Sequence, residues 1–303
     1  MAEHGTAERD GPSPERVETL QCMEIIGGNE ALQRAIAAPG LDIWVDSQPL
    51  GGKAGGDIHY FSMCGSGRVT RLAVADVSGH GAHVDPMARS LRQLMRKYIN
   101  MLDQTRFAQA LNREFPLEVG DDYFATVLLA TYFAPTDHLI ICNGGHPRPL
   151  WFSQRSQRWH PLDPSLQDTG PSIAEAKGTY ALRPVANLPL GVIEPTHYYQ
   201  FDIQLAEGDV VLIYTDALIE VPRADGARLG EAGLLALAES IAPAAPAQVA
   251  RALLDAVAAW SGHAAAEDDQ TLIVLRHNAS DPPRMNVKQA IRSLAKMIGL
   301  RRV

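Results

Sequence analysis

Aspartates stand at the ends of several apolar stretches of this 303-residue chain. Asp57 follows two glycines, Asp76 follows the stretch LAVA, and Asp216 follows VVLIYT. The pair Asp268–Asp269 comes just before TLIVL. A carboxylate at the mouth of a buried strand is costly unless it is paired or coordinated, although a lone aspartate there is more often a turn or helix-capping residue. Together these residues form an oxygen-only ligand set, which suits Mg²⁺ or Mn²⁺ better than zinc.

The segment VADVSGHGAHV, residues 74–84, contains one of these aspartates, Asp76. Carboxylate sites of this kind can hold two ions roughly 3.5–4 Å apart and activate a water for attack on phosphorus. Gly79 and Gly81 would let the backbone turn tightly and bring a main-chain carbonyl beside an ion. His80 lacks partners for a zinc site or for general acid catalysis, so packing at the start of a helix is its simpler interpretation.

Two other glycine-rich segments are not assigned any chemistry. GGKAGGD, residues 51–57, resembles a phosphate-binding loop only in composition, since Ala54 stands where serine or threonine should bind magnesium. NGGHPRPLWF, residues 143–152, contains no reactive nucleophile and is typical of a glycine turn that closes a hairpin. The three cysteines lie far apart with no CxxC, so neither a disulfide framework nor a thiolate zinc site is indicated.

The charge balance limits the classes of partner. Lys and Arg number 27 against 35 Asp and Glu, a net charge of −8, which disfavours nucleic-acid binding because phosphate neutralisation needs clustered basic charge. The N-terminus lacks the apolar core of a signal peptide, and no window approaches a transmembrane segment. We therefore expect a cytoplasmic protein.

The elements that must position the aspartates follow one another in hairpin order. Strands in this order, with one helical pair inserted among them and another near the end, predict an α+β fold with antiparallel sheets. Helical periodicity predicts helices over residues 83–99, 105–115, 231–241 and 247–260. The predicted strands cover residues 58–63, 68–76, 123–134, 138–145, 148–153, 197–205, 209–221 and 271–277.

Seven short motifs resemble, in order, those of the SpoIIE-type branch of the metal-dependent PPM serine/threonine protein phosphatases. Each motif is weak alone, but the ordered set is specific and extends over roughly residues 40–276. The motifs are GGD (55–57), ADVSGHG (75–81), YFATVLLATY (123–132), CNGGHPRPLWF (142–152), NLPLGV (187–192), DVVLIYTDALIE (209–220) and EDDQTLIVL (267–275).

The resemblance implies an αββα sandwich, in which two antiparallel sheets are flanked by helical pairs, with two Mn²⁺ or Mg²⁺ ions at one end. It implies that Asp76 bridges both ions and that the Val77 carbonyl binds one of them. Asp216 and Asp268 would bind the second ion, and Asp57 would hold metal-bound water. Asp76 and Asp216 are the implied catalytic residues.

Three details of this implied site stay open. Asp268 is favoured over Asp269 as the ligand, but the sequence does not decide between them. Gly79 and His80 are further candidate site positions in the same motif as Asp76. Ala217 departs from the family, which usually has glycine there, and its methyl group could shift the backbone without removing the Asp216 carboxylate.

The resemblance implies hydrolysis of phosphoserine or phosphothreonine on a protein, by water and without a phosphoenzyme. The implied substrate is a phosphorylated STAS-type anti-anti-sigma factor in a partner-switching pathway. One alternative is a catalytically weak scaffold that binds a phosphorylated partner, and another is a hydrolase of small phosphoesters. Control could come from a partner protein, from a homodimer or from the helix after Gly81.

The chain is expected to divide into four parts. Residues 1–16 are predicted to be disordered, and loose helical spacing predicts a short helical segment over residues 17–39. Residues 40–278 would form the phosphatase domain. Residues 279–303 would form a basic amphipathic helix, which either docks a partner or membrane surface or simply covers the domain.

Overall fold

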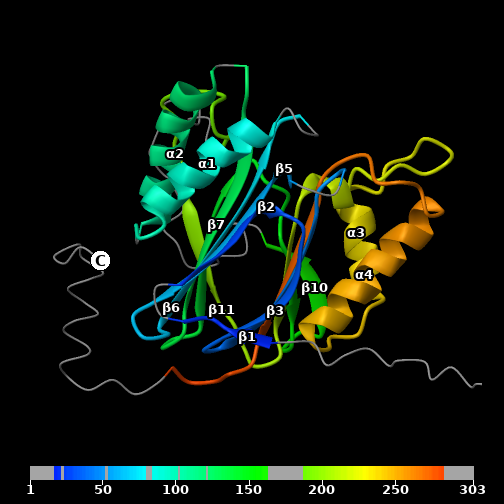
Figure 1. The fold of residues 1–303 in the computed structure, drawn as a ribbon. Coiled ribbons are helices and arrows are strands. Elements are labelled where there is room, and N and C mark those ends of the chain that lie inside the picture. The colour runs from blue at the N-terminus through cyan, green and yellow to red at the C-terminus, as the bar shows by residue number, and fades with distance from the viewer. Residues whose placement is uncertain are drawn as a thin grey trace, which may run out of the picture.

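Two β-sheets lie face to face, and a pair of helices covers the outer face of each (Figure 1). The computed structural model describes residues 17–21, 24–51, 54–79, 84–101, 103–120, 122–162 and 187–282. Three apolar clusters fill the spaces between the four layers. The α+β sandwich expected from the sequence is therefore confirmed.

The first sheet has seven strands, in the order β1, β3, β4, β13, β12, β9 and β10. The parallel pair β1 and β3 is joined to strands that otherwise pair antiparallel. The strand bounds are β1 Val17–Thr19, β3 Leu32–Ala38, β4 Leu41–Gln48, β9 Leu150–Ser153, β10 Arg158–Pro161, β12 Val210–Tyr214 and β13 Gln270–His277.

The second sheet has six antiparallel strands, in the order β11, β8, β7, β6, β5 and β2. Its central strands are apolar on both faces because one face meets the other sheet and the other meets helices. The strand bounds are β2 Ile25–Glu30, β5 Ala54–Cys64, β6 Val69–Val77, β7 Ala125–Phe133, β8 His138–Gly144 and β11 Gln200–Gln204.

The helices begin and end where local chemistry predicts. The Asp103 side chain caps α2 (Gln104–Val119) by accepting from the amides of Thr105 and Arg106. Gly262, with φ of 70°, ends α4 (Pro246–Ser261) in the left-handed conformation. The other helices are α1 (Asp85–Tyr98), α3 (Gly230–Glu239) and the short 3₁₀ helix η2 (Asp216–Leu218). Among the described residues, no helix has the length and apolarity needed to cross a membrane.

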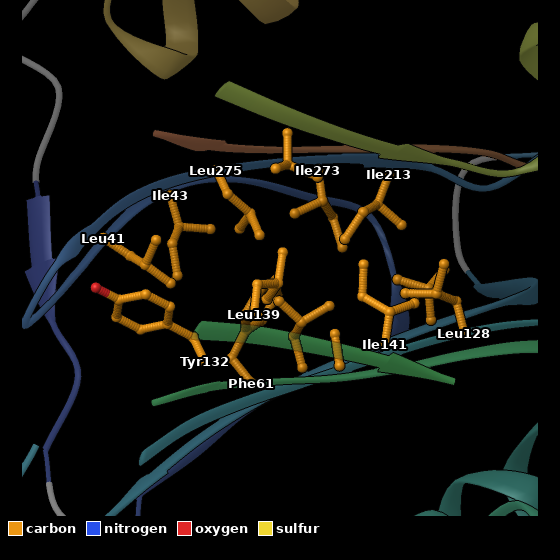
Figure 2. Close-up of a cluster of buried hydrophobic side chains, with 14 of the residues drawn as sticks. Leu41, Ile43, Phe61, Leu128, Tyr132, Leu139, Ile141, Ile213, Ile273 and Leu275 are labelled. Carbon is orange, nitrogen blue, oxygen red and sulfur yellow. The ribbon is translucent and has the colours of Figure 1, made fainter. Parts of the chain in front are cut away.

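The central core lies between the two sheets (Figure 2). Leu41 and Ile43 of β4 and Ile273 of β13 point down from the first sheet, and Phe61 of β5 and Leu128 of β7 point up from the second. All five are at most 2% exposed. This packing fixes how closely the two sheets approach each other.

The predicted helical segment over residues 17–39 is wrong. β1, β2 and β3 occupy this range, with a β-bulge between Gly28 and Glu30. β3 forms a hairpin with β4 around Gly40, whose φ is 79°. Pairing of β1 with β3, of β2 with β5 and of β3 with β4 overrides the loose helical spacing. These residues therefore belong to the same sandwich as the segment that was expected to begin at residue 40.

Two other predicted segments fall outside the described residues. The tail predicted to be disordered, residues 1–16, is one of them. Of the helix predicted over residues 279–303, only residues 279–282 are described, and they are not helical.

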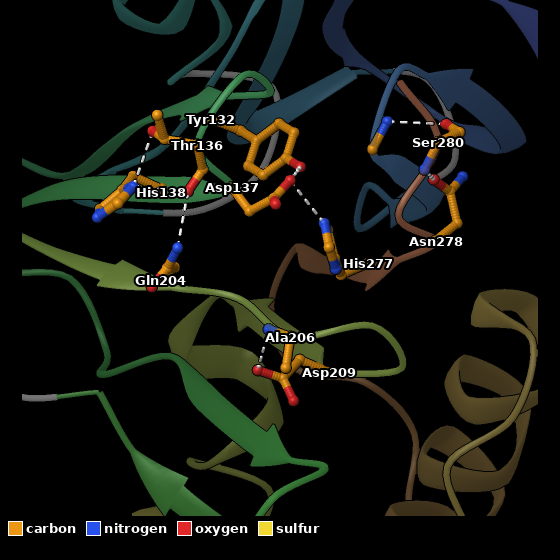
Figure 3. A network of polar contacts seen from close by, with 11 residues as sticks. Tyr132, Thr136, Asp137, His138, Gln204, Ala206, Asp209, His277, Asn278 and Ser280 are labelled. Carbon is orange, nitrogen blue, oxygen red and sulfur yellow. Dashed lines mark hydrogen bonds and ion pairs between the residues drawn. The ribbon is translucent and has the colours of Figure 1, made fainter. Parts of the chain in front are cut away.

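A polar network closes the end of the sandwich where β7 and β13 finish (Figure 3). The Tyr132 hydroxyl donates to Asp137 Oδ1 at 2.7 Å, and His277 Nε2 lies 3.0 Å from the same oxygen. Tyr132 belongs to the second sheet and His277 to the first. The contact therefore links the two sheets, while β7 and β13 both begin at the opposite end.

Shortening Ile273 should destabilise the sandwich in proportion to the volume removed. Ile273→Val is expected to lower the free energy of unfolding by about 0.5–1.5 kcal/mol and Ile273→Ala by about 2–5 kcal/mol, because a cavity between two sheets relaxes little. Urea denaturation with an unchanged m-value is the measurement. An alanine variant as stable as the valine variant would contradict the central position of this side chain.

Candidate metal centre

The structure brings the predicted acidic residues to one end of the sandwich. Asp57, near the start of β5, lies directly opposite Asp76, near the end of β6, in the strand register. Asp216 follows β12, and Asp268 precedes β13. Since β12 and β13 are antiparallel neighbours, the end of one lies beside the start of the other. Asp76 and Asp216 are close enough for the charge of one to act on the pKa of the other.

The Asp57 carboxylate is held by buried hydroxyl groups from the opposite sheet. Thr215 Oγ1 donates to Asp57 Oδ2 at 2.9 Å and accepts from the Thr271 amide at 2.9 Å. The Thr271 hydroxyl lies 3.0 Å from Ser47 Oγ and is close enough to Asp57 to lower its pKa. Asp57 Oδ1 is buried with no hydrogen-bond partner among the described residues. One carboxylate oxygen is therefore fixed, and the other is left for a further ligand.

Burial and mutual repulsion between carboxylates determine the electrostatics of this acidic group. Burial, followed by the charge of Asp76, raises the pKa of Asp57 well above its ordinary value. Burial also raises the pKa of Asp76, and the charges that act on it most strongly are all negative: Asp216, Asp268, Asp269 and Glu220. The pKa of Asp216 is raised to about 6 by burial, Glu220 and Asp268. Strongly shifted carboxylates of this kind are concentrated at functional sites.

The neighbouring aspartates 268 and 269 have different surroundings. Asp269 is 2% exposed and accepts hydrogen bonds from the amides of Leu50 and Gly56, both at 2.6 Å. A Cβ at Gly55 would lie 2.3 Å from the Asp269 carboxylate, so that position requires glycine. Asp268 is half-buried, accepts from the Asp269 amide at 2.8 Å, and raises the pKa of Asp216. Asp269 therefore clamps the start of β5, and Asp268 faces the acidic group.

The Val77 carbonyl lies beside Gly56. A Cβ at position 56 would come within 3.0 Å of the Val77 carbonyl oxygen. The glycine before Asp57 thus keeps this carbonyl uncovered, a role that the sequence suggested for the glycines after Asp76. Gly79 has a φ of 99°, a turn that favours glycine. His80 lies outside the described residues.

These donors fit a hard divalent cation. The buried Asp57 oxygen without a partner, the repelling carboxylates and the uncovered carbonyl are all oxygen donors of the kind that Mg²⁺ and Mn²⁺ prefer. In the described part of the chain, no three His, Cys, Asp and Glu side chains are yet close enough together to hold an ion. Binding would therefore require some of these carboxylates to move closer together.

Sequence reasoning missed three residues of this centre. Thr215 and Thr271 are fully buried and hold Asp57, and Glu220 raises the pKa of Asp216. A polar residue within an apolar run was the available signal for both threonines. For Glu220 the signal was its position four residues after Asp216, although that spacing alone predicts only a shared helix face.

His146 is a buried histidine, 5% exposed, that contacts the strand beside Asp76. Its Nδ1 is 2.8 Å from Thr126 Oγ1, and Thr126 is the register partner of Asp76. Burial lowers the pKa of His146 to about 3. The imidazole is therefore neutral in the folded protein near neutral pH.

Replacing each of the paired aspartates in metal-free protein should separate their roles. Asp269→Asn is expected to lower the free energy of unfolding by about 2–3 kcal/mol, because a buried charged acceptor of two amides is lost. Asp268→Asn keeps the acceptor for the next amide and removes a repelling charge, so it should be neutral or stabilising. Chemical denaturation in EDTA measures both. Equal losses in the free energy of unfolding would contradict different structural roles for the two residues.

The buried His146 should make the protein sensitive to acid. Its pKa is lowered on folding, so its contribution to stability is complete above the unfolded pKa of about 6.5 and is lost as the pH falls towards 3. Between pH 7 and pH 4.5, wild type should lose about 2–3 kcal/mol more than His146→Gln, which keeps a partner for Thr126. Denaturation curves across this range measure the difference, and parallel pH profiles would disprove a buried neutral imidazole.

Comparison with known proteins gives a consistent set of relatives. A family model described as Stage II sporulation protein E (SpoIIE) matches residues 66–170 and 169–278. Phosphoserine phosphatase RsbU of Bacillus subtilis (strain 168) is 26% identical over 242 residues, which are 78% of this chain and 63% of that protein. The chain therefore spans less than two thirds of the length of this relative.

Solved structures share the fold. The RsbU and RsbW domains of Rv1364c from Mycobacterium tuberculosis align with a TM-score of 0.62 at 23% identity, covering 90% of this chain and 72% of that one. The PP2C phosphatase domain of SpoIIE from Bacillus subtilis, with a fragment of its regulatory domain, gives a TM-score of 0.60 at 17% identity, covering 85% and 64%. RsbX in complex with magnesium gives 0.53 at 15% identity, covering 82% and 100%.

Proposed function

Because this chain belongs to the SpoIIE family of PPM-type phosphatases, we propose that it is a metal-dependent protein serine/threonine phosphatase. The observation that carries the proposal is the pairing of Asp57 and Asp76 in register, with Asp216 and Asp268 at the same end of the sandwich. A relative of 26% identity is a phosphoserine phosphatase, and a similar fold was solved with magnesium.

Five groups of this chain would hold two Mn²⁺ or Mg²⁺ ions. Asp76 would bridge the ions and the Val77 carbonyl would bind one of them, while Asp216 and Asp268 would bind the other. Asp57 would hold a water through the oxygen that no described residue contacts. When bound, the ions would neutralise the charge of the phosphate and lower the pKa of the water that attacks phosphorus.

The remaining residues orient the centre and exclude other chemistry. The Thr215 hydroxyl fixes one oxygen of Asp57, and Asp269 fixes the backbone at Gly56. Cys142 is buried, and burial and Asp103 raise its pKa to about 12, so it is not a thiolate nucleophile. These features support attack by water without a phosphoenzyme.

The proposed substrate is a phosphorylated STAS-type anti-anti-sigma factor in a partner-switching pathway. The resemblance of the seven motifs supports this substrate, as does the similarity to RsbU and to a structure that joins RsbU and RsbW domains. Fold alone does not identify a substrate. Turnover of a serine-phosphorylated STAS domain, compared with p-nitrophenyl phosphate, would distinguish a protein phosphatase from a hydrolase of small phosphoesters.

Asp76→Asn should abolish manganese-dependent activity. Loss of the bridging carboxylate is expected to lower kcat by at least about 10²–10³-fold, because it removes a ligand of both ions. Hydrolysis of p-nitrophenyl phosphate and of a phosphoserine peptide, with Mn²⁺ and with EDTA, measures this loss. Glu207→Gln, an exposed residue on the turn before β12, is the matched control and should retain full activity.

Two outcomes would contradict the proposal. Full activity of Asp76→Asn would exclude the assigned centre. A folded wild-type protein that hydrolyses neither compound with Mn²⁺, but binds the phosphopeptide, would indicate a scaffold rather than an enzyme.

A further inference from the structure

A cavity of about 520 Å³ opens directly beside the acidic group. Asp216 and Asp268 form the wall that it shares with the candidate metal centre. The loop after η2, the later turns of α4 and residues 264–267 form its other sides. Its volume lies within the range of sites that bind small ligands. A substrate whose phosphate lies at the centre therefore has a continuous cavity next to it.

We call this cavity the groove. One of its sides is a hairpin formed by residues 222–228. Pro222 and Arg228 pair as a β-bridge, and the Arg223 amide donates to the Ala227 carbonyl at 2.9 Å. The Arg223 guanidinium lies over the Trp260 ring of α4, 5.3 Å from its centre. This yellow hairpin stands beside the orange end of α4 in Figure 1. The groove is thus built between two elements that contact each other.

The floor of the groove is apolar, and its opposite side is formed by small residues. Leu254, Val257 and Ala258 of α4 line the floor. Ala264–Ala266 line the other side and are exposed, so no large side chain from this segment fills the opening. A short aliphatic side chain would bury apolar surface here, at roughly 25 cal/mol per Å².

The charged residues around the groove leave an excess of negative charge. Arg228 forms an ion pair with Glu220. Asp255 and Glu267 also line the groove, and neither has an ion-pair partner among the described residues. Even with Asp216 and Asp268 offset by cations, these two carboxylates remain. The groove is therefore complementary to a basic side chain.

We propose that this groove binds the stretch of substrate polypeptide next to the phosphorylated residue, and that it selects a segment with a short aliphatic side chain and a lysine or arginine. The proposal rests on the phosphatase activity proposed above. It assigns Asp255 and Glu267 to recognition of the basic side chain and the α4 floor to recognition of the aliphatic one. None of these residues belongs to the proposed metal centre.

Filling the groove is the first test. Ala265→Trp should lower kcat/KM for a phosphoserine peptide that carries lysine and valine near the phosphoserine by at least about tenfold, a loss of roughly 1.4 kcal/mol. Hydrolysis of p-nitrophenyl phosphate, which has no flanking chain, should stay within about twofold. Ala232→Trp, on the exposed face of α3, is the matched control and should change neither rate.

Removing the charges is the second test. Asp255→Asn combined with Glu267→Gln should lower kcat/KM for the lysine peptide by about three- to tenfold, the scale of exposed charge pairs, and should leave an alanine peptide unchanged. Glu207→Gln again serves as the control. Added salt should reduce the preference of wild type for lysine over glutamate in the peptide.

The outcomes separate this proposal from the phosphatase assignment. Suppose that wild type hydrolyses p-nitrophenyl phosphate with Mn²⁺, but that no groove variant changes kcat/KM for the peptides. That result would contradict peptide binding in the groove and leave the phosphatase assignment intact. Fluorescein-labelled phosphopeptides are also titrated against each variant with Mn²⁺ and followed by anisotropy, so the groove is tested even without turnover. Ala265→Trp should raise Kd at least about fivefold, and an unchanged Kd would overturn the proposal.

Discussion

The carboxylates of the buried Asp57 and the half-buried Asp76 lie opposite each other across β5 and β6, and the surrounding structure is arranged around their mutual repulsion. Burial and like charge raise the pKa of both groups. In a purely structural sheet, apolar residues would fill these positions at lower cost. Instead, Asp216 and Asp268 lie near this pair and add further negative charge. Bound cations in the working protein would offset that charge.

The sandwich architecture decides which groups can reach this pair. Thr271 belongs to the first sheet and Thr215 directly follows its strand β12, and they contact Asp57 of the second sheet only because the two sheets pack closely. The apolar cluster in Figure 2 sets that spacing. At the other end, the contact of Tyr132 and His277 with Asp137 links the sheets and closes the sandwich (Figure 3). The end with the aspartates stays accessible.

The adjacent residues Asp268 and Asp269, at the start of β13, have different surroundings. Asp269 binds two amides that lie more than 200 residues earlier in the chain, and this fixes the start of β5. Asp268 is left to face the acidic group and the groove beside it. The same short segment therefore connects the sheet, the candidate centre and the proposed recognition site for the substrate.

The sequence alone determined the α+β class, most strands and helices, and the acidic residues at the strand ends, because apolar runs that end in aspartate are local patterns. It failed over residues 17–38, where pairing of β1 with β3, of β2 with β5 and of β3 with β4 decides the conformation. Only the tertiary structure showed that Asp268 and Asp269 have different contacts, identified Gly56 as the residue beside the Val77 carbonyl, and formed the groove. Each of these depends on contacts between distant segments, for which no local pattern is a guide.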